Sequence, residues 1–267
     1  MTRSCVCSSR PAGELVHEVR DDVVVSGLVP YGDADLVVRL LVRGLGRVGA
    51  FARGARRSRR RFPGLCAPAL GRAALRERRA SELWELVEVD LDPVVLGLAS
   101  DPRALGFAAY LVELCERLLP EAEPNPDVFD LTTSALRVVA TTGARAVLLR
   151  AFELQLLRQL GWLPDLHQVD GPVTAFDAEA GRLLSTPSAG AVQFPEEARA
   201  AALALLASPL DALPDLDPAT ARGVSRLFGA ALARHVTRPL KSVAFLRSLG
   251  PTDAPATDGI AGPRSSR

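Results

Sequence analysis

The chain has 267 residues and a formal net charge of +1, and 48% of its residues are hydrophobic, which is enough for one large core or two modest ones. Its apolar runs are shorter than the roughly 20 residues that cross a bilayer, so we expect no membrane span. The N-terminal sequence MTRSCVCSSRPAG lacks the apolar centre of a signal peptide, which predicts a cytoplasmic protein.

Positive charge is concentrated in one segment. Twelve arginines and one acid lie between Arg43 and Arg79, so this segment carries +11 and the remainder of the chain carries −10. Within it, residues 53–61 read RGARRSRRR. Such asymmetry indicates a polyanionic partner for the segment. The alternative is a solvated arginine-rich loop or a localisation-like patch.

Residues 1–13 are predicted to be a disordered tail, and residues 14–98 to be a β-domain. Its segments are rich in β-branched residues or alternate in polarity, and Gly-rich turns separate them. They read DDVVVSGLVPYG, ADLVVRLLVRG, RVGAFARGA, ALGRAALRER and SELWELVEVDLD. Five short strands in about 80 residues favour a small closed barrel such as an OB-fold. Periodicity alone does not distinguish a strand from a helix for ADLVVRLLVRGL.

Residues 99–250 are predicted to form an α-helical domain, which makes the chain an α+β multidomain protein. Three helix starts pair a capping side chain with proline, at Asp101, Asn125 and Asp217. Apolar residues then recur at helical spacing, and Cys115 lies among them, so we expect it in the core. The predicted helices cover residues 103–119, 127–143, 144–161, 195–207 and 218–236.

Two segments of this half are not predicted to be helical. Residues 162–194 are rich in turn formers and indicate an inserted irregular or hairpin module. Residues 251–267, PTDAPATDGIAGPRSSR, are typical of a disordered tail.

The arginine-rich run is the best candidate binding site. Arginines carried on a barrel can follow phosphates, and such binding weakens steeply with salt because counterions are released. Phe51 and Phe62 flank the run and either stack on bases or belong to the barrel core. The predicted DNA-binding residues are Arg43, Arg47, Arg53, Arg56, Arg57, Arg59, Arg60 and Arg61.

No catalytic motif is present in the sequence. His17, His167 and His235 stand alone, and there is no phosphate loop, dinucleotide fingerprint or nucleophile elbow. We therefore predict a protein that is not an enzyme. A metal-dependent nuclease is the alternative from another class, and it would require carboxylates that the fold brings together.

Three ordered stretches resemble the RecO family of recombination mediators. The run VPYGDADLVVRLLVRGLGRVGAFARGARRSRRRFPG is similar to the family's first-domain signature, in which a YGE.D turn precedes a KGARRSKSRFGG-like run. FELQLLRQLGWLPDL, residues 152–166, resembles FEL.LL..LGY.P.L, and HVTRPLKSVAFL, residues 235–246, resembles HL.RPLKS..FL. The stretches occur in the family's order, and the resemblance covers roughly residues 14–249, nearly the whole chain.

The resemblance implies an N-terminal OB-fold and a C-terminal helical domain. It implies binding of single- and double-stranded DNA, annealing of complementary strands, and partnership with RecR and with the C-terminal tail of the single-stranded DNA-binding protein. The joint task would be loading RecA during gap repair, by a nucleoid-associated protein that needs no cofactor. An OB-fold protein that binds RNA is the alternative.

Two further expectations follow from the resemblance. Many family members carry a four-cysteine zinc site after the second motif, but here the aligned residues are His167, Asp170, Ser185 and Ser188. Serine is a poor zinc ligand, so we predict a degenerate zinc-finger-like insertion without metal. Arg238 and Lys241 are candidates for a second basic contact, with DNA or with an acidic tail, or else are ordinary surface charges.

Overall fold

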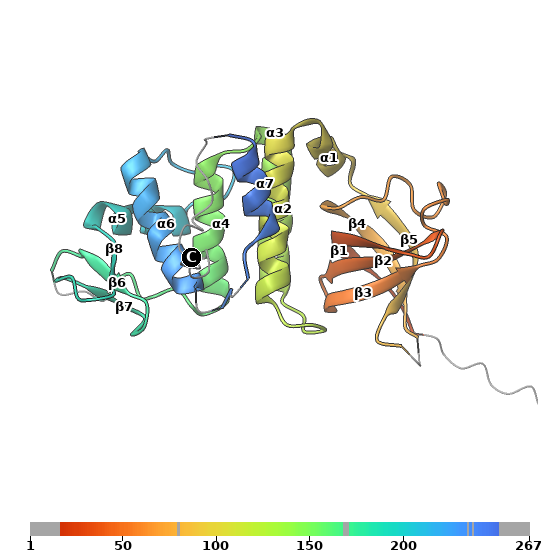
Figure 1. The fold of residues 1–267 in the computed structure, drawn as a ribbon, viewed down its shortest axis with the longest axis horizontal. Coiled ribbons are helices and arrows are strands. Elements are labelled where there is room, and N and C mark those ends of the chain that lie inside the picture. The colour runs from red at the N-terminus through yellow and green to blue at the C-terminus, as the bar shows by residue number, and fades with distance from the viewer. Residues whose placement is uncertain (1–16, 79–80, 168–170, 234, 237, 251–267) are drawn as a thin grey trace, which may run out of the picture.

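The computed structural model describes residues 17–78, 81–167, 171–233, 235–236 and 238–250, and it consists of a β-barrel followed by helices (Figure 1). The barrel lies at one end of an elongated molecule and a small sheet lies at the other (Figure 1). This is the expected α+β order. The two tails predicted to be disordered, residues 1–13 and 251–267, lie outside the described residues.

Five strands close into the barrel in the order β1-β2-β3-β5-β4. Strand β1 pairs with both β4 and β2, and a register shift between Val25 and Gly27 bends it from one partner to the other. The segment ADLVVRLLVRGL, for which both a strand and a helix were possible, contains strand β2. The strands are β1 (Glu18–Tyr31), β2 (Asp35–Val42), β3 (Gly46–Ala52), β4 (Ala69–Arg76) and β5 (Trp84–Leu91).

Alternation along each strand fills the barrel. Every second residue points inward, as Val23 and Val25 of β1 and Val38 and Leu40 of β2 do, and each of these is at most 2% exposed. Phe62 belongs to the same core and is 2% exposed. Of the two interpretations of Phe62, base stacking and core packing, core packing is therefore correct.

Three helices begin at the prolines that follow the predicted caps, at Pro102, Pro126 and Pro218, whereas the short helix at 93–96 and the turn at 97–100 were not predicted. Each of the three caps that precede a proline accepts hydrogen bonds from N–H groups in the first turn of its helix. Helix α6 ends at Leu232, four residues before its predicted end. The helices are α1 (Pro93–Leu96), the 3-10 turn η1 (Gly97–Ser100), α2 (Pro102–Leu118), α3 (Pro126–Thr142), α4 (Ala146–Gln159), α5 (Glu196–Ala207), α6 (Pro218–Leu232) and α7 (Lys241–Ser248).

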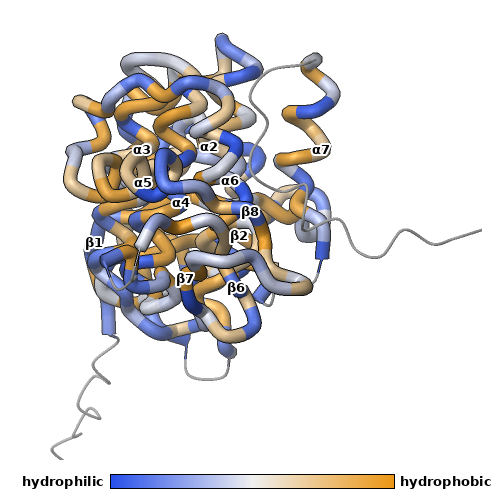
Figure 2. The backbone as a smooth tube through the Cα atoms, turned by 90° about the vertical axis from the view of Figure 1, so that its left-hand side faces the viewer, coloured by the Kyte–Doolittle hydropathy of each residue, from blue (hydrophilic) through white to orange (hydrophobic). Residues whose placement is uncertain are grey.

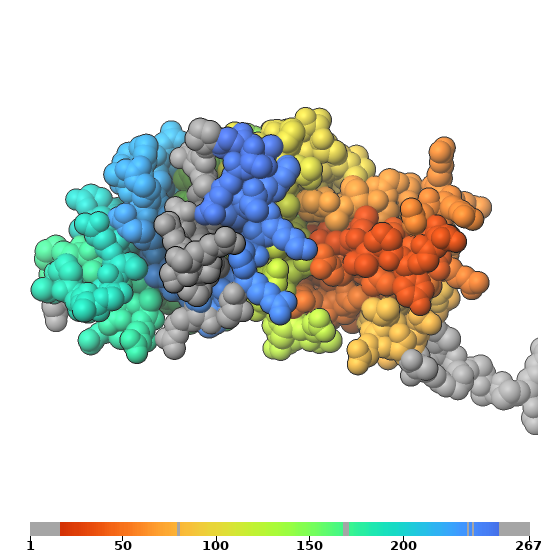
Figure 3. Space-filling model, in the orientation of Figure 1, coloured from red at the N-terminus to blue at the C-terminus, as the bar shows by residue number. Residues whose placement is uncertain are grey.

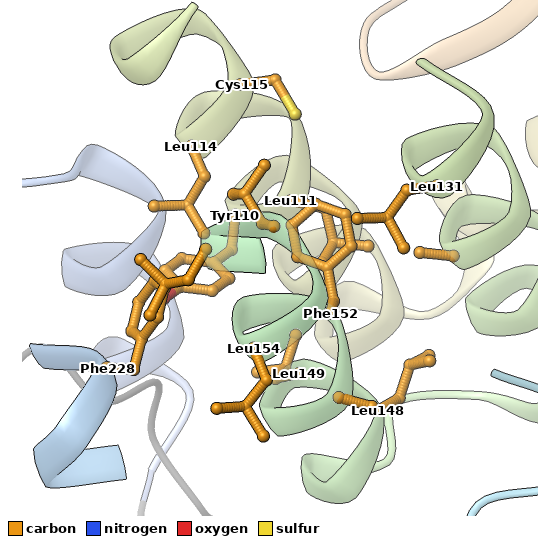
Figure 4. Packing of buried hydrophobic residues seen from close by; sticks show 14 of the residues in the cluster. Tyr110, Leu111, Leu114, Cys115, Leu131, Leu148, Leu149, Phe152, Leu154 and Phe228 are labelled. Atoms are coloured by element: carbon orange, nitrogen blue, oxygen red, sulfur yellow. The ribbon is translucent and has the colours of Figure 1, made fainter. Parts of the chain in front are cut away.

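Helices α2, α4 and α6 share one apolar core. Tyr110, Leu111 and Leu114 of α2 meet Phe152 of α4 and Phe228 of α6 (Figure 4). Apolar and polar segments alternate along the helices, as the amphipathic spacing predicts (Figure 2). Among the described residues, no helix is both long and apolar enough to cross a membrane.

Cys115 is buried in this core, as predicted, at 2% exposure. Burial raises the pKa of its thiol to about 11, so the thiol is uncharged at neutral pH.

A charged cluster lies inside the helical core. Glu153 accepts hydrogen bonds from the Tyr110 hydroxyl at 2.7 Å and from Arg150 Nη1 at 2.5 Å, and all three side chains are buried. Burial, with the neighbouring carboxylate, raises the pKa of Tyr110 well above its ordinary value. The cluster ties α2 to α4, and it is satisfied rather than available for chemistry.

Residues 162–194 contain regular structure, which corrects the expectation of an irregular insertion. Strands β6 (Ala175–Asp177), β7 (Arg182–Leu184) and β8 (Val192–Gln193) form an antiparallel sheet in the order β7-β6-β8. Strands β6 and β7 pair as a hairpin, which was the alternative prediction for this segment. Phe176 and Phe194 are buried and extend the helical core into this module.

Helix α7 was not predicted. It lies against α2 at one side of the helices (Figures 1 and 2), and its first turn is capped from α2. Glu113 accepts from the N–H groups of Lys241 and Ser242 at 3.0 and 2.8 Å and from the Ser242 hydroxyl at 2.7 Å. The cap is 128 residues away in sequence from Lys241, so no local pattern could reveal it.

Candidate nucleic-acid interface

The arginine loop, residues 53–61, begins at the end of β3 and is held to the neighbouring β1–β2 turn. The Gly54 N–H donates to Asp35 Oδ1 at 2.7 Å, and the Arg56 N–H donates to the Ala34 carbonyl at 3.0 Å. Gly54 has a φ of +68°, which glycine adopts without strain. The loop therefore leaves the barrel in a fixed direction.

Further contacts hold the rest of the loop. The N–H groups of Arg57 and Ser58 donate to the Gly54 carbonyl at 3.1 and 3.0 Å, and Ala55 is only 8% exposed. At the far end, the Arg61 carbonyl accepts from the Val89 N–H of β5 at 3.0 Å. Backbone hydrogen bonds and the buried Ala55 side chain thus hold most of the loop, and the Arg61 side chain links its two ends by donating to the Arg53 carbonyl.

The six loop arginines are all exposed, and their charges are not neutralised by the protein. Arg56 donates to the Asp33 carbonyl at 3.4 Å and Arg61 donates to the Arg53 carbonyl at 2.7 Å, but carbonyl groups carry no net charge. Within the described part of the chain, no carboxylate forms an ion pair with any of the six. The loop lies at the end of the barrel away from the helices (Figure 1).

A groove of about 420 Å³ continues from the loop onto β1, β4 and β5. Arg60 and Arg61 line it together with Arg20 and Arg72. The last two have acidic neighbours, since Arg20 pairs with Glu88 at 2.9 Å and Arg72 approaches Asp22 at 3.9 Å. The groove is therefore most basic where it meets the loop.

Arg43 and Arg47, predicted with the loop arginines, have a different environment. Arg43 forms two hydrogen bonds to the Asp130 carboxylate of α3, at 3.0 and 2.9 Å. This hydrogen bonding holds the pKa of Asp130 below its usual range. Arg47 donates to the Leu119 carbonyl and lies 3.6 Å from Glu121. Both side chains join the barrel to the helical part, and a role in binding DNA stays a prediction for them.

A cleft of about 520 Å³ lies between the barrel and helices α2 and α7. Lys241, one of the two residues of the predicted second basic contact, lines it together with Arg39 and Arg117. Arg39 pairs with Glu116 at 3.1 Å and Arg117 lies 3.6 Å from Glu113. Arg238 is exposed in the segment that precedes α7 and does not line the cleft.

Three of the four degenerate zinc positions lie at the surface. His167, Ser185 and Ser188 are exposed, and Asp170 lies outside the described residues. Within the ranges that the structure describes, no three His, Cys, Asp or Glu side chains gather as metal ligands. The absence of zinc stays a prediction.

The three histidines have separate surroundings. The His17 ring lies 6.2 Å from that of Trp84 on the barrel, and His235 stacks on Trp162 at 3.6 Å in the helical part. His167 stands at the exposed end of the segment that follows α4. The prediction that the protein is not an enzyme stays a prediction.

Sequence reasoning missed several residues next to the arginine loop. Tyr31 is 61% exposed at the end of β1, and its ring meets that of Phe51 edge-on, with centroids 5.5 Å apart. The Arg78 guanidinium lies over the Phe51 ring, 5.7 Å from its centroid. Tyr31 lies within the predicted turn, Pro30 to Gly32, which was the only signal in the sequence.

Comparisons with known proteins cover both parts of the chain. The family model described as Recombination protein O N terminal matches residues 16–91, and the one described as Recombination protein O C terminal matches residues 99–244. Curated relatives named DNA repair protein RecO include one from Anaeromyxobacter sp. (strain K), 35% identical over 85% of this chain and 95% of the relative.

Two further relatives with the same name come from other genera. The Myxococcus xanthus protein is 33% identical over 86% of this chain and 97% of its own length, and the Geobacter sulfurreducens protein is 31% identical over 88% and 100%. Because both family models match in order and the relatives align over nearly their whole length, the chain belongs to the RecO family.

Proposed function

We propose that this protein is a DNA-binding recombination mediator in DNA repair and that its barrel is an OB-fold. The observation that carries the proposal is the set of six exposed, unpaired arginines on a loop that the barrel holds rigidly. The strand order β1-β2-β3-β5-β4 supports the OB-fold, a five-stranded barrel that binds oligonucleotides. Residues 14–98 would form the DNA-binding domain and residues 99–250 the helical one.

In this mechanism, the loop arginines contact phosphates and displace counterions from the strand. Two complementary strands repel each other, and a dense array of cations lowers that repulsion within about 10 Å at moderate salt. Arg60 and Arg61 stand where the loop meets the basic groove, so a strand bound at the loop can extend along β4 and β5. The protein would thereby promote annealing of complementary strands.

The partners of this activity follow from family membership as proposals. The protein would act with RecR and with the C-terminal tail of the single-stranded DNA-binding protein, and it would help to load RecA onto coated strands. Lys241 and Arg238 are candidates for the contact with an acidic tail or with DNA. Work on chromosomal DNA would place the protein in the cytoplasm, at the nucleoid.

A strand-annealing assay on complementary oligonucleotides tests the proposal. The oligonucleotides are coated with single-stranded DNA-binding protein, and annealing is followed over a salt series with and without RecR. We expect annealing to accelerate with this protein and the effect to fall as salt rises. Unchanged annealing rates, together with no measurable affinity for DNA at low salt, would refute the proposal.

An OB-fold protein specialised for RNA is the competing function. Competition between DNA and RNA oligonucleotides of matched sequence separates the two. Preferential displacement of DNA by RNA would favour the RNA-binding alternative, whereas equal or weaker competition by RNA supports action on DNA. Readout of the 2′-hydroxyl is the means by which a protein would make that distinction.

A further inference from the structure

An apolar row crosses the outer face of the barrel beside the arginine loop. Val29 of β1 is paired with Val37 of β2, and Val37 is paired with Phe51 of β3. Because cross-strand partners share a face of the sheet, these three side chains stand side by side. Val29 is 47% exposed, and Val37 and Phe51 are half-buried, so the row faces solvent rather than the barrel core.

Tyr31 extends the row toward the loop. It lies two residues beyond Val29 on the same face and meets Phe51 edge-on, with ring planes at 86°. An exposed tyrosine and a neighbouring phenylalanine are a costly arrangement on a surface that meets only water. The Arg78 guanidinium over the Phe51 ring adds a cation at its border.

Neighbouring positions on the same face are covered by other parts of the chain. The next pair along, Gly27 and Arg39, is covered because the Arg39 guanidinium lies against Gly27 and pairs with Glu116 of α2. On β3, Gly49 lies two residues before Phe51 on the same face. The Leu83 side chain fills the space that a side chain at position 49 would occupy. Within the described chain, the Val29–Tyr31–Phe51 surface stays open to solvent except at Phe51, where the Arg78 guanidinium lies 5.7 Å from the ring centroid.

The same turn fixes the positions of this surface and the arginine loop. Tyr31 is the cross-strand partner of Asp35, and the Asp35 carboxylate holds the Gly54 N–H. Phe51 is separated from Arg53 by one residue. Cations that can hold phosphates therefore stand beside rings that can hold bases, which is the combination that single-strand binders use.

We propose that Tyr31 and Phe51 are a stacking platform for the unpaired bases of a single-stranded nucleic acid whose phosphates contact the arginine loop. The inference rests on the proposed function and deepens it, because it names the single strand as the form that the barrel prefers. The bases of a duplex are already stacked on each other and their faces are closed, so a duplex can use the arginines but not the rings. Figure 3 shows β1, in red, at the surface of the barrel.

Two variants separate stacking from apolar contact and from loss of the fold. Replacing both rings by leucine, Tyr31→Leu with Phe51→Leu, keeps the surface apolar and the strands intact. Tyr31→Trp keeps a ring at the first position. Val94→Ala is the matched control, since Val94 is 49% exposed on α1 and distant in sequence from the row.

The test measures the affinity of each variant for a single strand and for a duplex of the same sequence, over a salt series. We expect the double leucine variant to lose about 5- to 150-fold in single-strand affinity, the effect of removing one stacked base. Its duplex affinity and salt slope should match those of the unaltered protein, because the arginines remain. Tyr31→Trp should retain the preference, and Val94→Ala should change neither affinity.

A spectroscopic readout reports stacking itself. A single strand that carries 2-aminopurine should change its fluorescence on binding to the unaltered protein and to Tyr31→Trp, and much less on binding to the double leucine variant. RNA and DNA single strands are compared in parallel, and a ring platform alone should accept both.

Three outcomes overturn the inference. Equal losses for single strand and duplex would mean that the rings only support the loop, and no loss for either would mean that they face another ligand, such as an apolar peptide. In both cases the unaltered protein still binds DNA, so the proposed function stands. An unaltered protein that binds neither form overturns the platform and the proposed function together.

Discussion

Arginines occur in two contrasting settings on the barrel. On the arginine loop, six arginines are exposed and none has a carboxylate partner among the described residues, although Arg56 and Arg61 donate to backbone carbonyls. At the join to the helices, Arg39, Arg43 and Arg47 all have acidic partners. Nothing in the sequence separates Arg43 and Arg47 from the loop arginines, because all lie in the basic segment 43–79, and Arg39 lies just before it. Whether an arginine is available to a ligand depends on the partner that the fold supplies.

The difference has a simple structural cause. The loop is held mainly by backbone hydrogen bonds and by Phe62 in the core, with one added bond from the Arg61 side chain to the Arg53 carbonyl, so it needs no carboxylate partner for its arginines. At the join, Asp130 and Glu121 of the helical part are placed opposite the arginines, and the charges neutralise each other. A polyanion would meet full positive charge at the loop and compensated charge at the join.

Removal of the loop charges should have the largest effect on DNA binding. Replacing Arg56, Arg57, Arg59, Arg60 and Arg61 together by alanine should weaken single-strand affinity by about a hundredfold or more at low salt. The magnitude of the salt slope should fall by about 0.7 for each phosphate that the variant no longer neutralises. Affinity titrations over a salt series measure both. The double variant Arg137→Ala with Arg145→Ala is the control, since both residues pair with acids in the helical part.

A folded loop variant whose DNA affinity and salt slope are unchanged would contradict this prediction. Arginines without a carboxylate partner would then bind DNA no better than paired ones. Circular dichroism of the variant shows whether the fold is kept.

The buried arginine is a third setting and should affect stability rather than binding. Glu153→Leu leaves Arg150 buried without this carboxylate, which should cost about 3–5 kcal/mol of unfolding free energy. Adding Arg150→Met should recover part of the loss, because both charges are then gone. Urea denaturation measures each value. If Glu153→Leu alone were as stable as the unaltered protein, burial of Arg150 would not require its ion pair with Glu153.

Loss of the α7 cap should have an intermediate effect. Glu113→Ala removes the acceptor for two backbone N–H groups and a hydroxyl, which should destabilise the docking of α7 by about 1–2 kcal/mol. Hydrogen exchange of the α7 amides should accelerate, while exchange in the barrel should not. Equal acceleration throughout the chain would mean that α7 does not open independently.

The same cap predicts a dependence on pH. Burial alone would raise the pKa of Glu113, but hydrogen bonds from Ser242 and the Lys241 N–H outweigh it, and the net pKa is lowered. A lowered pKa in the folded state means that the cap stabilises α7 fully above about pH 4.3, the ordinary glutamate value, and loses this effect as the pH falls through the folded-state pKa. Protection of the α7 amides from exchange should therefore decrease as the pH falls through this range. In the Glu113→Ala variant, this pH-dependent decrease should be absent.

Removal of a paired arginine at the join should have the smallest effect. Arg43→Ala should leave DNA affinity and salt slope nearly unchanged, because its charge is already neutralised by Asp130. The pKa of Asp130 should rise when its hydrogen-bond partner is removed, which an NMR titration of the carboxyl group can follow. A fall in the salt slope of Arg43→Ala comparable to that of a single loop arginine would place Arg43 at the DNA instead.

Local patterns predicted most of the secondary structure. The alternation in β1 to β5, and the Asp-Pro and Asn-Pro pairs that start α2, α3 and α6, are signals that lie within a few residues of the element they specify. Helix α7 had no such signal, because its cap is Glu113 on α2. The short strands β6 to β8 were not resolved as a sheet, since two or three residues are too few for alternation to be seen.

The candidate site was predicted only in part, for the same reason. The loop arginines are adjacent in sequence, so their collective charge was visible as a run. The apolar row was not, because Tyr31, Val37 and Phe51 belong to three strands and meet only through cross-strand pairing. Phe62 was left between core and surface until the fold placed it inside the barrel.

By itself, the sequence determined that a β-domain precedes a helical one, the position of the basic run and the family to which the chain belongs. These properties depend on residue spacing and on the chemistry of neighbouring residues. Only the tertiary structure decided which arginines are neutralised and which aromatic rings remain exposed. Charge pairing and burial depend on groups such as Asp130 and Glu116, which lie 87 and 77 residues away from Arg43 and Arg39, and such distances are closed by the fold alone.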